Sequence, residues 1–400
     1  MTKRPDLDRP LHVLVATPAG LAGQGGIDRI MSTLRAELAR QARDDISVRF
    51  RASRGSGSVL LSVFYMLGFC FEMTVAHLFR RCDIVHINLS SFGSTYRKMI
   101  IARWARLLGI AYVLHLHGAE YQTFWTANES LLATHIRAMF ENAGGIVVLG
   151  RVWADFVAKQ APASAGRILI IPNAAAAPST KHVGGGDKVH ILFLGRVGKR
   201  KGVPQLIAAL EHMRDLPGWR ATIAGDGEVE EARAEISRLG LADRVEIPGW
   251  VGADDVANLI ATADILTLPS FAENLPVSVI EGMAAGLAVV TTPVGAVSDI
   301  VRNGESGLLI EPGDVEALSA ALTTLTKDEH LRKKLGEAAQ QVHREKLDSE
   351  PFAAALINCW KSASQGISPA VAAHEDDEAA GIPPSHRQTA QSWNLREHDS

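Results

Sequence analysis

The sequence predicts an α/β protein made of two doubly wound domains, each built on a parallel sheet. Its 400 residues exceed what one ordinary hydrophobic core organises, so about two domains are expected. Short apolar runs alternate with amphipathic helical patterns, and both halves begin with an apolar run, a glycine-rich turn and a helix pattern. Strands that are apolar throughout are typical of parallel sheets covered by helices on both faces.

The first domain is predicted over residues 1–172. It begins with LHVLVATP, the turn AGLAGQGGIDR and the helix pattern IMSTLRAELARQ, and its later strands are DIVHIN, AYVLHLH, GGIVVLG and RILIIPN. The second domain is predicted over residues 189–349. It begins with VHILFLG, GRVGKRKG and VPQLIAALEHM, and its later strands are WRATIAGDG, RVEIPGW, ADILTLPS, AVVTTP and GLLIEP.

Three further segments connect or follow these domains. Residues 173–188 (NAAAAPSTKHVGGGDK) lack periodicity and are predicted to be a linker and hinge. Residues 350–365 are expected to form a C-terminal helix that packs back on the first domain. Residues 366–400 contain three prolines and few branched apolar residues, which predicts a disordered tail.

Composition narrows the class of protein. With 47% hydrophobic and 21% charged residues, the chain is expected to be a soluble globular protein. Its three cysteines are widely spaced, which favours neither a disulfide framework nor a zinc cluster and fits a reducing cytoplasm. The N-terminus lacks the pattern of a secretion signal. No nucleic-acid partner is expected.

The charge is divided unevenly between the two halves. Residues 1–180 hold 20 Lys and Arg against 12 Asp and Glu, whereas the whole chain has a net charge of -3. We therefore expect the two halves to face different partners.

Residues 59–79 (VLLSVFYMLGFCFEMTVAHLF) are strongly apolar. Their uninterrupted part, Val63 to Phe71, is shorter than the ~20 residues that a membrane-spanning helix needs. Two interpretations stay open: a core helix with solvated ends, or an interfacial helix docked on an anionic membrane surface. The second is favoured by the arginines on either side, which are Arg49, Arg51, Arg54, Arg80 and Arg81.

The stretch FAENLPVSVIEGMAAG, residues 271–286, follows the strand ADILTLPS. It predicts a helix that begins at Pro276 and ends before Gly286. In an open parallel sheet, ligands lie beyond the carboxyl ends of strands, where a helix start favours phosphate. Val277 and Ser278 offer backbone N–H groups there. We therefore expect a diphosphate at this turn.

Two glutamates bracket this helix start. Glu273 precedes the expected phosphate site, and Glu281 lies about 7 to 8 Å along the helix from Pro276. Ionised carboxylates accept hydrogen bonds from vicinal hydroxyls, so one glutamate for a sugar and one for a ribose is a coherent assignment. The alternative is that Glu273 is a solvated loop acid and Glu281 a surface helix residue.

Other strand ends offer cations, glycines and a histidine. In GRVGKRKG, Arg196 and Lys201 are the best candidates to neutralise a diphosphate, although a solvated basic loop is the alternative. Gly25 and Gly26 of GQGG would bring backbone N–H groups to a phosphate from the first domain. His117 of HLHGAEY is expected either to touch substrate or to be structural.

Two kinds of chemistry find no support. The spacing G-x-G-x-x-G is absent from the first turn, so hydride transfer is not indicated. No Asp-x-Asp pair follows a strand, and Asp254 and Asp255 are typical of a helix cap and first turn. We therefore expect neither a metal nor another cofactor.

Several motifs together resemble a known family. GRVGKRKG, IAGDGE, ADILTLPS, FAENLPVSVIEGMAAGLAVVTTPVGAVSDIV and NGESGLLIEPGD, in this order and spacing, resemble the second domain of the retaining family 4 glycosyltransferases, also called group 1. The first half is similar through GGIDR and HLHG. The resemblance implies the GT-B fold, in which two Rossmann-like domains face a central cleft and no metal is required.

The resemblance also implies roles for the candidate residues. Glu273 would contact the transferred sugar, Glu281 the ribose, and Arg196 and Lys201 the diphosphate. Donor contacts are further implied at Gly25, Gly26, Asn274, Leu275 and Val277, with His117 bordering the sugar. Retention without an obvious nucleophile implies front-face displacement, with Glu273 as a covalent nucleophile as the alternative.

The predicted function is the transfer of a hexose to a glycan in exopolysaccharide or cell-surface polysaccharide synthesis. GDP-mannose is the favoured donor and a UDP-sugar the second choice. The basic first domain and the apolar segment favour a polyprenyl-diphosphate-linked acceptor and peripheral contact with the inner face of the cytoplasmic membrane. A GT-B nucleotide-sugar epimerase and a catalytically silent sugar-nucleotide binding protein are the alternatives.

Overall fold

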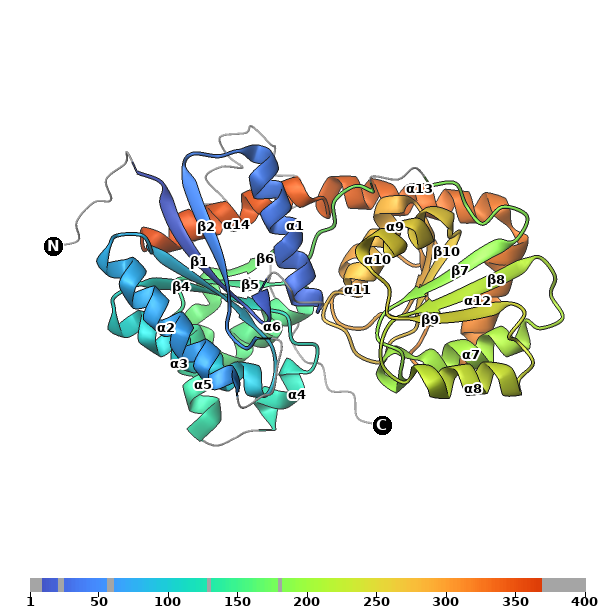
Figure 1. The fold of residues 1–400 in the computed structure, drawn as a ribbon, viewed down its shortest axis with the longest axis horizontal. Coiled ribbons are helices and arrows are strands. Elements are labelled where there is room, and N and C mark those ends of the chain that lie inside the picture. The colour runs from blue at the N-terminus through green and yellow to red at the C-terminus, as the bar shows by residue number, and fades with distance from the viewer. Residues whose placement is uncertain (1–8, 21–24, 56–60, 128–130, 179–181, 369–400) are drawn as a thin grey trace, which may run out of the picture.

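The computed structural model describes residues 9–20, 25–55, 61–127, 131–178 and 182–368. They form two α/β units that lie side by side, with a long C-terminal helical segment running across both (Figure 1). Each unit contains a six-stranded parallel sheet. The predicted α/β architecture of two doubly wound domains is therefore confirmed.

The N-terminal sheet has the strand order β2-β1-β3-β4-β5-β6. Its strands are β1 (Leu11–Thr17), β2 (Ile46–Ala52), β3 (Ile84–Leu89), β4 (Ala111–Leu116), β5 (Gly145–Val148) and β6 (Ile168–Ile170). The helices between them are α1 (Gly26–Gln41), α2 (Ser62–Leu78), α3 (Gly93–Leu107), α4 (Tyr121–Thr126), α5 (Leu131–Glu141) and α6 (Arg151–Gln160). Since side chains alternate along a strand, Val13 and Val15 pack under α1, whereas Leu14 and Ala16 join the core under α2, α3 and α5.

The C-terminal sheet has the order β12-β11-β10-β7-β8-β9. Its strands are β7 (Val189–Leu194), β8 (Trp219–Ala224), β9 (Val245–Gly249), β10 (Ile265–Leu268), β11 (Ala288–Thr291) and β12 (Leu308–Leu309). The helices of this half are α7 (Val203–His212), α8 (Val229–Arg238), α9 (Ala253–Thr262), α10 (Val277–Ala285), α11 (Val297–Ile300), α12 (Val315–Lys327) and α13 (Glu329–Lys346). In both sheets the first strand of the unit lies in the interior, so the loops that follow neighbouring strands gather at one edge.

The strand β2 was not predicted from the sequence. It is an edge strand that pairs in parallel with β1, with Leu11 opposite Ile46. Its apolar residues alternate with Arg49 and Arg51, and the arginines hid the strand pattern. Both arginines bind Glu72 of α2, at 3.4 and 2.8 Å. Part of the basic flank of residues 59–79 is therefore neutralised inside the domain.

The start of α10 differs by one residue from the prediction. Pro276 has φ −73° and ψ 126°, so it precedes the helix as its N-cap instead of occupying the first helical position. The first free backbone N–H groups therefore belong to Val277 and Ser278. At the other end, Gly286 adopts φ 75° and closes the helix.

The chain ends by returning to the N-terminal unit. Helix α13 packs on the C-terminal unit, and α14 (Ser349–Ser364) then lies on the N-terminal sheet, as Figure 1 shows. Phe352 and Trp360 are buried there, and Trp360 Nε1 donates to His86 Nδ1 at 3.0 Å. The predicted tail, residues 366–400, lies outside the described residues except for its first three.

Replacement of Trp360 tests the contribution of α14. Because the indole is fully buried, Trp360→Ala should lower the free energy of unfolding by about 3–5 kcal/mol, measured by urea denaturation. Phe71→Ala is the control, since this ring is 72% exposed and its loss should cost under about 1 kcal/mol. Equal losses in the two variants would mean that α14 is only loosely attached.

Candidate active site

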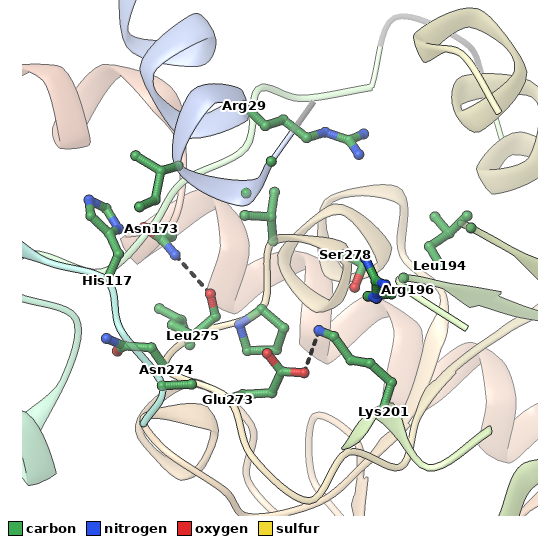
Figure 2. Close-up of a pocket in the computed structure, with 18 of the residues that line it drawn as sticks. Arg29, His117, Asn173, Leu194, Arg196, Lys201, Glu273, Asn274, Leu275 and Ser278 are labelled. Carbon is green, nitrogen blue, oxygen red and sulfur yellow. Dashed lines mark hydrogen bonds and ion pairs between the residues drawn. The ribbon is translucent and has the colours of Figure 1, made fainter. Parts of the chain in front are cut away.

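A cleft of about 740 Å³ lies between the two units, at the carboxyl ends of both sheets (Figure 2). The N-terminal unit and the linker contribute Gly25, Gly26, Ile27, Arg29, Ser90, Ser91, Phe92, His117, Ala119, Glu120, Leu149 and Asn173. The C-terminal unit contributes Leu194, Gly195, Arg196, Arg200, Lys201, Ala224, Gly225, Asp226, Trp250, Val251, Val256, Glu273, Asn274, Leu275, Pro276, Val277 and Ser278. Apart from Glu281, every residue singled out for the site from the sequence is in this lining.

The centre of the cleft holds an ion pair between Lys201 and Glu273. Lys201 Nζ lies 2.5 Å from Glu273 Oε1, and the two side chains are only 15% and 9% exposed. Figure 2 shows them meeting from two different loops, the turn after β7 and the loop after β10. An ammonium group has three N–H donors, so Lys201 retains donors for a ligand while it holds the carboxylate.

Two glycines allow close approach to the loop that carries Glu273. Gly202 follows the turn Lys199–Lys201 with φ 72°, and a Cβ there would lie 2.0 Å from the carbonyl oxygen of Pro269. Gly295, in the loop after β11, has φ 61°, and a Cβ there would lie 2.2 Å from the carbonyl oxygen of Glu273. A larger residue at either position would displace the loop that carries Glu273, so the ion pair depends on both glycines.

Two further cations of the turn after β7, Arg196 and Arg200, make different contacts. Arg196 lines the cleft with a side chain that is 68% exposed, and its guanidinium lies 3.5 Å from Asp226. Arg200 donates to the carbonyl of Ala272 at 2.8 Å and so fastens the basic turn to the loop that carries Glu273. Arg196 is therefore the cation best able to move onto an anionic ligand.

Glu281 lies one helical turn beyond the cleft lining. It follows Val277 by four residues and Ser278 by three, so it shares their face of α10. Its Oε1 pairs with Arg29 of α1 at 2.6 Å, across the two units, and its Oε2 is buried without a hydrogen-bond partner. Burial raises the pKa of Glu281 to about 7, although Arg29 opposes this shift. The free oxygen is suited to a hydroxyl group, and its role as ribose ligand stays a prediction.

His117 faces the cleft as a neutral ring. Its Nε2 lies 2.9 Å from Asn88 Oδ1, and Asn88 Nδ2 donates to the carbonyl of Ala16. Since the amide oxygen can only accept, Nε2 of His117 carries the proton and Nδ1 is left as an acceptor. Burial lowers the pKa of His117 to about 3, so the ring stays uncharged at neutral pH.

His117 is the outermost of three histidines whose rings contact one another in turn, and the inner two are buried in the N-terminal unit. His117 stacks on His115 with ring centroids 4.0 Å apart, and His115 Nδ1 lies 3.3 Å from His86 Nε2. His86 Nδ1 accepts from Trp360 of α14, so its Nε2 carries the proton that His115 accepts. The position of His117 is therefore tied to the packing of α14.

Gly25 and Gly26 lie at the start of α1. Gly25 precedes the helix with φ −78° and ψ 161°, and both residues are exposed in the cleft. Gly25 and Gly26 line the same cavity as Val277 and Ser278 at the start of α10. Their contact with phosphate is not tested by the structure.

Two asparagines bridge the units and have fixed orientations. Asn274 Nδ2 donates to the carbonyl of Leu116 at 3.1 Å, and Asn173 Nδ2 donates to the carbonyl of Leu275 at 2.8 Å. The amide oxygens of both asparagines are buried without partners. Asn274 and Leu275 therefore hold the cleft closed as well as lining it, and each asparagine oxygen remains able to accept from a hydroxyl.

Sequence reasoning missed many of the lining residues, and Arg29 and Trp250 are the most informative of them. Arg29 ends the GGIDR motif, but nothing in the sequence indicates that it meets Glu281 of the other half. Trp250 follows β9 and is 56% exposed, which is unusual for an indole inside a cleft. An aromatic residue directly after a predicted strand was the available signal.

Among the described residues, no group of three His, Cys, Asp or Glu side chains is arranged to hold a metal ion.

Two models of known protein families match the sequence of this chain. A model described as "Glycosyl transferase 4-like domain" matches residues 8–174, and one described as "Glycosyl transferases group 1" matches residues 179–342. Together they span both units of the structure.

The chain belongs to the group 1 glycosyltransferases.

Similar proteins include other glycosyltransferases. An uncharacterised glycosyltransferase of Methanocaldococcus jannaschii is 27% identical over 45% of this chain and 46% of its own length. The 2-deoxystreptamine N-acetyl-D-glucosaminyltransferase of Streptomyces fradiae is 28% identical over 65% of this chain and 66% of its own length. The chain thus spans about half to two thirds of these relatives.

A solved structure supports the fold. Anabaena HepE in complex with UDP-glucose aligns with a TM-score of 0.69 and 19% identity, covering 88% of this chain and 100% of HepE. The chain therefore has the GT-B fold that the resemblance implied.

The raised pKa of Glu281 predicts how donor affinity depends on pH. If the ionised carboxylate accepts from the ribose, affinity for an intact nucleotide sugar should fall about tenfold between pH 8 and pH 6 as Glu281 takes up a proton. Isothermal titration calorimetry would measure this change, and Glu281→Gln should show a flat profile. A slope that persists unchanged in Glu281→Gln would assign it to another group, such as Lys98, whose pKa burial lowers to about 7.

Proposed function

We propose that this glycosyltransferase transfers a hexosyl group, with retention, from a nucleotide-diphosphate sugar to a glycan acceptor. The observation that carries the proposal is the Lys201–Glu273 pair beside the start of α10. A carboxylate, two cations and free helix N–H groups surround one cavity there. That set of groups matches the hydroxyls of a sugar and the charge of a diphosphate.

The leaving group is stabilised by positive charge. Arg196 and the unshared N–H groups of Lys201 would neutralise the diphosphate as the bond from the sugar C1 to the phosphate oxygen breaks. The N–H groups of Val277 and Ser278 lie at the same helix start. Hydrogen-bond donors that are already in place stabilise the negative charge that develops on the diphosphate, and no side chain has to move first. We expect this stabilisation to be the largest contribution to catalysis in this site.

The acceptor attacks on the face that the diphosphate leaves. In this front-face displacement, the acceptor oxygen bonds to C1 while its proton passes to the departing phosphate oxygen. Lys201 already binds Glu273 at 2.5 Å, which lowers the electron density available for attack on carbon. This contact favours Glu273 as a ligand of sugar hydroxyls over the alternative role of covalent nucleophile, and His117 Nδ1 would accept from a further hydroxyl. No step requires a metal.

The donor and acceptor are proposed from different observations. Mannose from GDP-mannose is the first donor to test, as the resemblance favours, and the complex of HepE with UDP-glucose supports UDP-sugars as the second. Trp250 lines the cleft with an exposed indole, which offers a flat apolar surface suited to stacking on a nucleobase. The acceptor proposed is a polyprenyl-diphosphate-linked glycan of exopolysaccharide or cell-surface polysaccharide synthesis, since the N-terminal half carries the excess of positive charge.

Replacement of the cations tests the mechanism. Arg196→Ala and Lys201→Ala should each lower kcat by roughly 100-fold or more and weaken donor binding much less, because their charge acts chiefly on the leaving diphosphate. Lys199→Ala is the matched control, since Lys199 belongs to the same turn and is not part of the cleft lining. Steady-state kinetics and donor titration give both quantities. Unchanged turnover in the two variants would contradict the mechanism.

A donor panel tests the function itself. Release of nucleoside diphosphate from GDP- and UDP-sugars should rise for one donor when a membrane lipid extract supplies the acceptor. Conversion of a donor to its epimer without acceptor would instead show a nucleotide-sugar epimerase. Donor binding without turnover on any acceptor fraction would show a catalytically silent binding protein.

A further inference from the structure

Exposed apolar side chains gather on two neighbouring helices of the N-terminal unit. We call this surface the α2–α3 face. Its residues are 40–73% exposed and comprise Val63, Phe64, Leu67, Phe71, Leu78, Phe79, Phe92, Tyr96, Ile100, Trp104 and Leu107. Isolated apolar residues on a surface are ordinary, but a contiguous set of this size marks an interaction site.

The exposed residues form a stripe along each helix. On α2, the spacing from Phe64 through Leu67 and Phe71 to Leu78 places them on one side, while Met66, Phe69 and Met73 of the same helix are buried. The helix therefore buries one face in the core and exposes an equally apolar face. The interpretation as a core helix with solvated ends describes only the buried side of α2, and docking of the exposed side on a membrane stays a prediction.

The stripe on α3 joins the stripe on α2. Tyr96, Ile100 and Trp104 follow one another at intervals of four residues, so they share one side of α3. Trp104 Nε1 donates to Thr74 Oγ1 at 2.9 Å, and Thr74 lies between Phe71 and Leu78 on α2. This bond connects the exposed sides of the two helices into one surface.

The charges on and around the α2–α3 face are mostly positive. Helix α3 contains no acidic residue, and the acidic residue of α2, Glu72, is held by Arg49 and Arg51. Exposed arginines follow α2 at Arg80 and Arg81, and α3 presents Arg103 and Arg106 next to Leu107. An apolar surface bordered by arginines complements an anionic lipid surface.

The face begins at the cleft. Phe92 lines the cleft and is also the first exposed aromatic residue of the α3 stripe, one helical turn before Tyr96. Its ring packs against Phe124 at 5.1 Å between centroids, and its backbone has φ 57°, which is rare for a bulky residue. The surrounding structure thus holds an aromatic side chain at the boundary between the cleft and the face.

We propose that the α2–α3 face docks on an anionic lipid bilayer, so that the Phe92 end of the cleft opens at the headgroup layer. Within the described residues, no helix is long and apolar enough to cross a membrane, so α2 and α3 would lie in the interface. A second copy of the chain is the poorer occupant, because a two-fold contact would bring the same arginines together. The docking proposal does not depend on which nucleotide sugar binds in the cleft.

Flotation with lipid vesicles tests the proposal. The full chain should float with phosphatidylcholine vesicles that contain phosphatidylglycerol, and much less with phosphatidylcholine alone or at high salt. Phe64→Ser/Phe71→Ser should weaken binding roughly 10- to 100-fold, because two exposed rings no longer enter the interface. Ile170→Ser/Val183→Ser is the matched control, since both residues are exposed and lie away from α2 and α3.

A second pair of variants tests the charge. Arg103→Gln/Arg106→Gln should weaken binding to the anionic vesicles roughly 25-fold and leave binding to neutral ones unchanged. Arg302→Gln/Arg344→Gln, exposed arginines of the C-terminal unit, should change neither. All variants should retain the thermal melting temperature and donor affinity of the parent protein, because none of these residues lines the cleft.

The outcomes separate this proposal from the proposed function. A chain that does not float with anionic vesicles, or an α2 variant that binds as tightly as the parent, would overturn the bilayer proposal even if transfer is active. A dimer in sedimentation velocity that Phe64→Ser/Phe71→Ser dissociates would assign the face to self-association instead. A chain that floats but transfers no sugar would refute the proposed function and leave the docking surface standing.

Discussion

The cleft exists because α14 is buried on the N-terminal sheet. The chain leaves the C-terminal unit through α13, and Trp360 then fills a fully buried position beside His86. Burial of an indole and its hydrogen bond stabilises one arrangement of the two units. Parallel strands deliver loops to a single edge of each sheet, and this attachment, together with the contacts of Asn274 and Arg29 across the units, makes the two edges face each other. The catalytic proposal therefore depends on a helix that contributes no residue to the cleft lining.

Two ion pairs and one neutral histidine lie in and beside the cleft. Lys201 and Glu273 neutralise each other, Arg29 and Glu281 do so across the units, and His117 is uncharged. A diphosphate entering the cleft would redistribute these pairs. The Arg29–Glu281 pair also holds the units together, so a ligand that displaced it would weaken a contact between them. The buried amide bonds of Asn173 and Asn274 belong to the same closed state.

The α2–α3 face shows how one helix can satisfy two environments. Met66, Phe69 and Met73 belong to the core, while Phe64, Phe71 and Leu78 are exposed on the same helix. A helix that is apolar on all sides carries little directional pattern, so its two faces look alike in the sequence. Which side of α2 is buried depends on the elements that pack against it. One side packs in the core of the N-terminal unit, and no described element covers the other.

The sequence by itself determined the α/β class, the two units and the charged centre of the cleft. Alternating strand and helix patterns located every strand except β2, whose arginines concealed it. Loops that follow neighbouring strands of one sheet gather at one edge, so Glu273, Lys201 and Arg196 were correctly expected to lie together. Only the tertiary structure decided that Arg29 meets Glu281, that Asn274 reaches the carbonyl of Leu116, and which side of α2 is exposed. These contacts join residues far apart in the chain, and local periodicity carries no information about the relative placement of two units.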